Sequence, residues 1–179
     1  MPDRVTTQPS VRRIAVVLAL FIGAGAAAGV LWERLWSAPA GLTYQGEWFL
    51  EPAGPDLSFE GTALYVLIAL PVGLLLAIAC TLRPHHEVST VVAVLVAAGL
   101  GAVTMYAVGH GLGPPDPQAL AAGQPDFTPL SGDLVLGSST PGERPFSSTA
   151  LMAMPVGAMA GLVGVYLLGR RRIDTSSRG

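Results

Sequence analysis

Four long stretches of the chain contain no Asp, Glu, Lys or Arg. The hydrocarbon core of a bilayer is about 30 Å thick, a distance that a helix of roughly 20 residues crosses. Within lipid each backbone amide must find its hydrogen-bond partner inside its own segment, which favours α-helices. A membrane β-barrel would instead alternate apolar and polar residues in strands of about ten residues, and the chain lacks that pattern. We therefore predict four membrane-spanning helices from the stretches Ile14–Trp32, Thr62–Leu82, Val88–Gly109 and Ser147–Gly169.

The composition agrees with a lipid-exposed protein. Hydrophobic residues make up 51% of the chain and charged residues only 12%, whereas about 25% is usual in soluble domains. The predicted fold class is an all-α membrane protein, a four-transmembrane-helix bundle with two extracytoplasmic loops. The predicted order is a cytoplasmic tail (1–13), a span (14–36), an outer loop (37–61), a span (62–82), a cytoplasmic turn (83–87), a span (88–110), an outer loop (111–146), a span (147–169) and a cytoplasmic tail (170–179).

The first apolar stretch has features of both a signal peptide and a permanent anchor. Arg12 and Arg13 precede it, and the small residues of 37–40 resemble a signal-peptidase site. However, the stretch is longer than the usual signal-peptide core of about 7–15 residues, and the bulky segment Trp32–Trp36 separates it from that site. These features favour a retained anchor.

The arginines predict the orientation. All ten basic residues are Arg, and eight of them fall on one side of the predicted spans: Arg4, Arg12, Arg13, Arg83, Arg170, Arg171, Arg172 and Arg178. Since cytoplasmic segments carry the excess of basic residues, both termini and the turn 83–87 are predicted to be cytoplasmic, in a multi-pass plasma-membrane protein. The other side carries Arg34, Arg144 and nine acidic residues. Trp32 and Trp36 are expected to lie at the outer membrane interface, where indole rings concentrate.

The segments between the spans suggest local structure. Leu42–Leu50 is rich in strand-forming residues and is broken at Gln45-Gly46, which predicts a small β-hairpin in the first outer loop. The second outer loop has one or two helical turns predicted near Pro117–Ala122, and mobility is expected over 131–144, where apolar surface is sparse. Because the turn 83–87 is short, the second and third spans are expected to be antiparallel neighbours.

Small residues at four-residue spacing predict close helix packing. The pairs are Gly25 with Gly29, Ala97 with Gly101, and Gly157 with Gly161. Such faces allow backbones of membrane helices to approach one another. They would serve either a homo-oligomer or the packing of a single four-helix bundle, and the bundle is the favoured interpretation.

Two prolines interrupt predicted spans within similar pentapeptides. Pro71 lies in Ala69-Leu70-Pro71-Val72-Gly73, and Pro155 lies in Ala153-Met154-Pro155-Val156-Gly157. Proline removes a backbone hydrogen bond, so each is expected to kink its helix. The similarity of the two segments also raises the hypothesis of a duplicated helical hairpin.

Residues with catalytic or metal-binding chemistry are few. No ionisable group lies inside a predicted span, which disfavours an ion-coupled transporter. His85-His86-Glu87 is interpreted as a polar turn rather than a metal site, His110 as an interfacial residue, and the loop acids as a solvated surface. Cys80, the one cysteine, is interpreted as a small apolar residue within a span. We predict no catalytic, metal or cofactor site, and no nucleic-acid binding.

Three short segments carry a resemblance to a protein family. They are Leu50-Glu51-Pro52 with Phe59-Glu60-Gly61, the segment Gly111–Pro117 followed by Ala119-Leu120-Ala121, and Pro155 in the first half of the last span. In these segments the chain resembles a family of uncharacterised four-span integral membrane proteins from actinobacteria. Ser138–Arg144 is longer than the family pattern. The resemblance implies the four-span architecture and no particular activity.

Three functional hypotheses follow. The favoured one is a non-enzymatic accessory or assembly subunit of a membrane complex or of the cell envelope, with the lipid bilayer and a larger complex or a homo-oligomer as partners. The alternative is a small transporter or lipid-handling subunit with a polar path near Thr104 and Tyr106. The third is a membrane enzyme that uses His110 and Asp116 at the outer interface.

Overall fold

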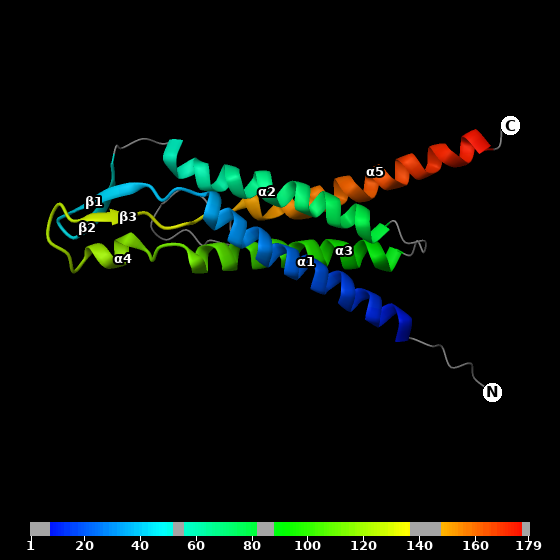
Figure 1. Cartoon of the computed structure of the whole chain (residues 1–179), viewed down its shortest axis with the longest axis horizontal. Helices are drawn as coiled ribbons and strands as arrows, with labels where there is room; N and C mark the ends of the chain where they lie inside the picture. Colours follow the sequence, from blue (N-terminus) through cyan, green and yellow to red (C-terminus); the bar gives the residue numbers. More distant parts are fainter. Residues whose placement is uncertain (1–7, 52–55, 82–87, 137–147, 177–179) are drawn as a thin grey trace.

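The computed structural model describes residues 8–51, 56–81, 88–136 and 148–176. Within these ranges the protein is mostly helical and carries four helices long and apolar enough to cross a membrane (Figure 1). They are α1 (Gln8–Leu35), α2 (Asp56–Thr81), α3 (Val88–Leu112) and α5 (Ala153–Ser176), the last preceded by the 3-10 helix η2 (Thr149–Met152). A small sheet and the short helix α4 (Pro117–Ala121) lie beyond one end of the bundle (Figure 1).

The helices are longer than the uncharged stretches at the end away from the sheet. α1 begins at Gln8, so Arg12 and Arg13 lie on the helix, and α5 continues to Ser176 past Arg170, Arg171 and Arg172. Figure 1 shows α1 beginning and α5 ending at this same end of the bundle. Arg83 and the turn 83–87, including His85-His86-Glu87, lie outside the described residues.

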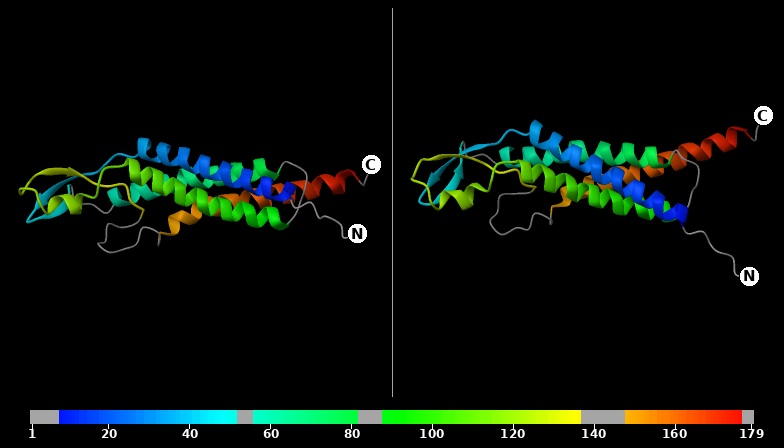
Figure 2. Two further views of the ribbon diagram at one scale, coloured as in Figure 1. Left: turned by 90° about the horizontal axis from the view of Figure 1, so that it is seen from below. Right: turned by 60° about the horizontal axis from the view of Figure 1, so that its bottom comes forward.

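The bundle is built from two parallel pairs of helices. α1 lies along α3 and α2 lies along α5, while α3 with α5 and α1 with α2 make the weaker contacts that join the pairs (Figure 2). α2 and α3 barely touch. The expectation that these two consecutive helices are neighbours is therefore wrong, because the faces that allow the closest backbone approach lie on α1 with α3 and on α2 with α5.

Glycines bring α1 and α3 into backbone contact. A Cβ on Gly25 would overlap the backbone oxygen of Gly101, and a Cβ on Gly29 would meet the oxygen of Met105 at 2.5 Å. Ala97 is fully buried on α3. The small residues of both helices are thus engaged within one chain, as the bundle interpretation requires.

α2 and α5 meet through the two similar pentapeptides. A Cβ on Gly73 would overlap the oxygen of Met154, and a Cβ on Gly157 would overlap the oxygen of Leu70. The fifth residue of each pentapeptide therefore contacts the second residue of the other. This reciprocal contact is the arrangement that a two-fold related pair of hairpins would produce. One turn further along α5, Gly161 packs against the oxygen of Leu74.

The two prolines occupy different positions in their helices. Pro71 lies inside α2, which continues through it. Pro155 lies in the first turn of α5, directly after η2. An N–H in the first turn of a helix has no partner within that helix, so Pro155 removes no hydrogen bond of α5. The kinks expected at Pro71 and Pro155 stay predictions.

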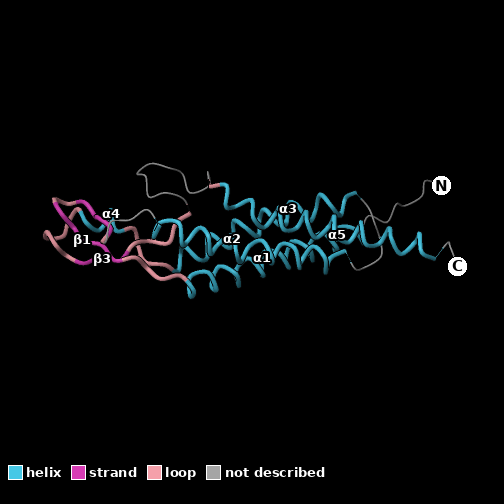
Figure 3. Tube along the Cα trace, turned by 90° about the horizontal axis from the view of Figure 1, so that it is seen from above, coloured by secondary structure: helices cyan, strands magenta, loops and turns pink. Residues whose placement is uncertain are grey.

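The predicted hairpin is confirmed, and a third strand joins it. β1 (Ala40–Tyr44) pairs antiparallel with β2 (Glu47–Leu50), with Leu42 opposite Phe49 and Tyr44 opposite Glu47. The turn places Gln45 and Gly46 at positive φ, as tight hairpins require. β3 (Pro129–Ser131), from the second loop, pairs with the other edge of β1, which gives the order β2-β1-β3. Figure 3 shows the strands together beyond the end of the long helices. We call this sheet with α4 and their connections (40–51 and 113–136) the head.

Candidate functional site

An aromatic cluster fills the end of the bundle that carries the head. Trp32 is fully buried, and its Nε1 donates to the backbone oxygen of Gly61 at 2.8 Å. Its ring lies edge-on to that of Tyr65, with centroids 5.1 Å apart, and is tilted to that of Tyr106, with centroids 6.3 Å apart. The Tyr65 hydroxyl donates to the oxygen of Ala102 at 2.8 Å. Trp32 is therefore a core residue of the bundle, and its expected position at the outer membrane interface stays a prediction. Trp36 packs half-buried beside the same core.

His110 joins this cluster to the head. Its ring stacks on Tyr106, one helical turn earlier on α3, with centroids 5.5 Å apart and planes 7° apart. Its Nδ1 lies 2.8 Å from the backbone oxygen of Leu134. A carbonyl oxygen only accepts, so Nδ1 carries the proton in this contact. His110 thereby fastens the segment after β3 to the end of α3.

Leu134 inserts into the bundle at that point. Its side chain is fully buried and packs beside Gly61 of α2 and Gly113 at the end of α3. Leu136 is buried as well. Mobility over 131–144 is expected from sparse apolar surface, but that premise does not hold for 131–136, where two leucines are buried. The mobility itself stays a prediction, and 137–144 lies outside the described residues.

Asp133 lies next to this junction in a partly desolvated position. Burial raises the pKa of its carboxyl group, and the nearby Asp116 carboxylate raises it further, while a backbone hydrogen bond and His110 act in the opposite direction. Burial dominates because a low-dielectric environment disfavours the charged form.

Replacement of Asp133 should change how stability depends on pH. Since the folded-state pKa lies above the unfolded one, the folded state holds more protons between the two values, and stability falls as pH rises from about 4. We expect Asp133→Asn to raise the thermal unfolding midpoint relative to the parent at pH 7, with the difference shrinking toward pH 4. If Asp133→Asn shifts the unfolding midpoint equally at pH 4 and pH 7, the raised pKa of the Asp133 carboxyl group is contradicted.

The other residues considered for chemistry are occupied or apart. Asp116 caps α4, where its Oδ1 accepts from the Gln118 N–H at 2.9 Å. The recorded side-chain hydrogen bonds of Asp116 and His110, which the enzyme hypothesis pairs, go to Gln118 and to Leu134 rather than to each other. The Thr104 hydroxyl donates to Leu100 of its own helix at 2.8 Å. Cys80 packs half-buried against the core. Among the described residues no three His, Cys, Asp or Glu side chains form a metal-binding group.

The sheet of the head has two different faces. Thr43 and Trp48 lie opposite each other on the buried face; Thr43 is fully buried, and the Trp48 ring crosses Gly41 to donate from Nε1 to Leu130 on β3 at 3.1 Å. Side chains alternate along a strand, so Tyr44 and Phe49 lie on the other face. They are 46% and 50% exposed.

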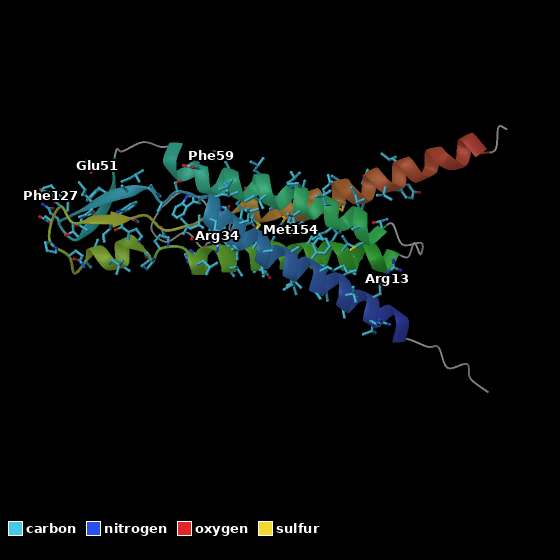
Figure 4. All side chains as sticks on the ribbon, in the orientation of Figure 1. Arg13, Arg34, Glu51, Phe59, Phe127 and Met154 are labelled. Carbon is cyan, nitrogen blue, oxygen red and sulfur yellow. The ribbon has the colours of Figure 1, made fainter. Side chains whose placement is uncertain are left out.

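Hydrogen bonds hold the loop before β3 against β1. Thr43 Oγ1 donates to Pro125 at 2.7 Å and accepts from the Thr128 N–H at 2.9 Å. The Phe127 N–H donates to the Thr43 oxygen at 2.6 Å. This loop presents Phe127, 68% exposed, with its ring 5.8 Å from that of Tyr44. Figure 4 shows Phe127 at the tip of the head.

Gln118 closes the free edge of the sheet. Its side-chain amide accepts from the Trp48 N–H at 3.2 Å and donates to the Trp48 oxygen at 3.0 Å. These are the two groups that an added strand would use. This part of the sheet edge is therefore closed, whereas the face that carries Tyr44 and Phe49 is open.

Sequence reasoning did not identify Thr43, Gln118 or Phe127 as important. Each acts through a contact with a residue about 70 or more positions away, which local patterns do not report. One weak signal was available: the Pro- and Gly-rich composition around Phe127 is typical of a structured turn that displays one aromatic side chain.

Comparisons with known protein families, with curated proteins and with solved structures return nothing that matches this chain.

Proposed function

We propose that this protein is a non-enzymatic accessory subunit of a plasma-membrane complex, with both termini in the cytoplasm and the head on the outer side. The observation that carries the proposal is the head itself: a small, tightly hydrogen-bonded unit fixed to the end of a membrane bundle, with exposed aromatic side chains on one face. Such a unit is suited to binding another protein.

The orientation rests on the arginines. Figure 4 shows Arg13 toward the end of the bundle opposite the head and Arg34 on α1 at the head side. Arg12 precedes Arg13 on α1, and Arg170–Arg172 belong to the last turns of α5, which ends away from the head (Figure 1). The positive-inside rule assigns the Arg-rich end to the cytoplasm. The apolar side chains that the bundle leaves exposed, such as Leu67 at 70% and Leu75 at 63% on α2, are suited to lipid contact.

The hydrogen bonds of the polar groups in the bundle support an accessory role over transport. The hydroxyls of Tyr65 and Thr104 donate to helix carbonyls. The Tyr106 ring stacks on His110 and lies tilted against Trp32. A transporter or lipid-handling subunit remains the alternative, for which a water-accessible path beside Thr104 is the required feature.

Purification from the cells in which the protein is native tests the proposal. The full chain with a C-terminal affinity tag should be recovered in mild detergent with one membrane protein at reproducible stoichiometry, and cells that express the untagged chain provide the control. Recovery of a single, partner-free chain under several mild detergents would contradict the proposal.

A further inference from the structure

Three exposed aromatic side chains form one surface on the head. Tyr44 and Phe49 lie on the same face of the sheet, and Phe127 reaches Tyr44 from the adjoining loop. Their exposed fractions are 46%, 50% and 68%. We call these three residues the aromatic face. Exposed rings gathered in this way are typical of protein-binding surfaces, in which aromatic residues are enriched.

The aromatic face is organised before any partner arrives. Phe127 has a φ of 63°, a conformation that is unfavourable for a bulky side chain and that persists only where the surroundings enforce it. The enforcing contacts are the hydrogen bond from its N–H to Thr43 and the one from the Gln45 N–H to Asp126 Oδ1 at 2.8 Å. A backbone held in place in this way has little entropy left to lose on binding.

The charges around the aromatic face indicate the chemistry of the partner. Three exposed acids lie beside the aromatic face: Glu47 on β2, Glu51 directly after β2, and Asp126 in the adjoining loop. The head (40–51 and 113–136) contains no Arg, Lys or His. A second copy would bring acid against acid, and an anionic lipid surface would be repelled. A basic polypeptide has the complementary charge, and its Arg side chains would also stack on the aromatic rings.

We propose that the aromatic face binds an Arg- or Lys-rich extracytoplasmic segment of the partner subunit. This inference rests on the proposed accessory function and specifies the partner's chemistry. Phe127 and Tyr44 supply the apolar anchor, while Glu47 and Glu51 pair with basic side chains at its rim. Because Gln118 closes the edge of β2 at Trp48, the segment lies across the face of the sheet rather than extending it.

Photocrosslinking in native cells tests this inference. The photoreactive amino acid p-benzoylphenylalanine replaces Phe127 in the full chain, and the crosslinked peptide is identified by mass spectrometry. Matched control positions are Leu120, 42% exposed on α4, and Phe59, 67% exposed on α2. We expect a protein adduct at position 127 whose peptide carries net positive charge, and no such adduct at the controls.

Charge variants complete the test. In the photoreactive chain, Glu47→Lys with Glu51→Lys should reduce the adduct about tenfold, and Glu47→Gln with Glu51→Gln should reduce it less. Tryptophan fluorescence reports whether the head of each variant remains folded. If the double Lys variant unfolds, the double Gln variant serves as the test instead. An adduct with a second copy, with lipid, or with a neutral or acidic segment would overturn the inference. If a partner co-purifies but no adduct forms at position 127, the inference about the aromatic face is overturned and the accessory function stands. If no partner co-purifies, the accessory function and the inference are both rejected.

Discussion

Gly157→Ala is expected to destabilise the protein by about 2–3 kcal/mol, even though it adds a single methyl group. The added Cβ would overlap the backbone oxygen of Leu70, so α2 and α5 must separate. Backbone atoms cannot rotate away as a flexible side chain can, and separation weakens contacts along both helices. Reversible unfolding in mixed detergent micelles measures the change.

Gly164 provides the matched control on the same helix. A Cβ at Gly164 meets nothing within 4 Å, so Gly164→Ala should alter stability by no more than about 0.5 kcal/mol. Equal effects at positions 157 and 164 would show that helix propensity, rather than the α2–α5 contact, determines the outcome.

Trp32→Ala is expected to have the largest effect of any single substitution that we consider, a loss of about 3–5 kcal/mol. The ring is fully buried against Tyr65, Tyr106 and Gly109, and its removal leaves a cavity where α1, α2 and α3 meet. It also leaves the Gly61 oxygen without the indole donor. The same unfolding measurement applies.

Two further variants separate the contributions of Trp32. Trp32→Phe keeps much of the aromatic volume and removes the hydrogen bond, so it should cost about 1 kcal/mol from that bond together with a smaller packing loss. Leu31→Ala, at a neighbouring position that is 47% exposed, should have little effect. A Trp32→Ala variant as stable as Leu31→Ala would contradict the buried position of the indole.

The long apolar helices could be predicted from sequence because lipid imposes a simple requirement. A stretch without charges and long enough to cross the bilayer has few alternatives to a helix, and the hairpin was similarly marked by Gln45-Gly46. The partner of each helix was not predictable. Small residues show that a helix packs closely but not against which neighbour, and the short turn 83–87 suggested α2 with α3, whereas the glycines join α1 to α3 and α2 to α5.

The head was predicted only in part for a different reason. β3 has three residues and begins with Pro129, so it lacks the alternation that identifies a strand, and its formation depends on the edge that β1 offers. Leu134 begins the short apolar run Leu134-Val135-Leu136 in a loop otherwise rich in Gly and Ser, and its burial follows from the space beside Gly61 and Gly113. Trp32 carries the usual signature of an interfacial residue, and only the positions of Tyr65 and Tyr106 place it in the core.

The reciprocal contact between the two pentapeptides adds to the hypothesis of a duplicated hairpin. Gly73 and Gly157 occupy the fifth position of each, and each contacts the second residue of the other. α1 with α3 and α2 with α5 are also the pairs that a two-fold axis along the bundle would exchange. Duplication remains a prediction, which homologous sequences with more similar halves would support.

The proposed orientation and the proposed partner both require the head to lie outside the cell, and labelling of a single cysteine tests this position most directly. Phe127→Cys in a Cys80→Ala background places one thiol at the exposed tip of the head. A membrane-impermeant maleimide added to intact cells should label it as fully as after the cells are opened. Labelling that occurs only after the cells are opened would place the head in the cytoplasm and contradict the proposed orientation.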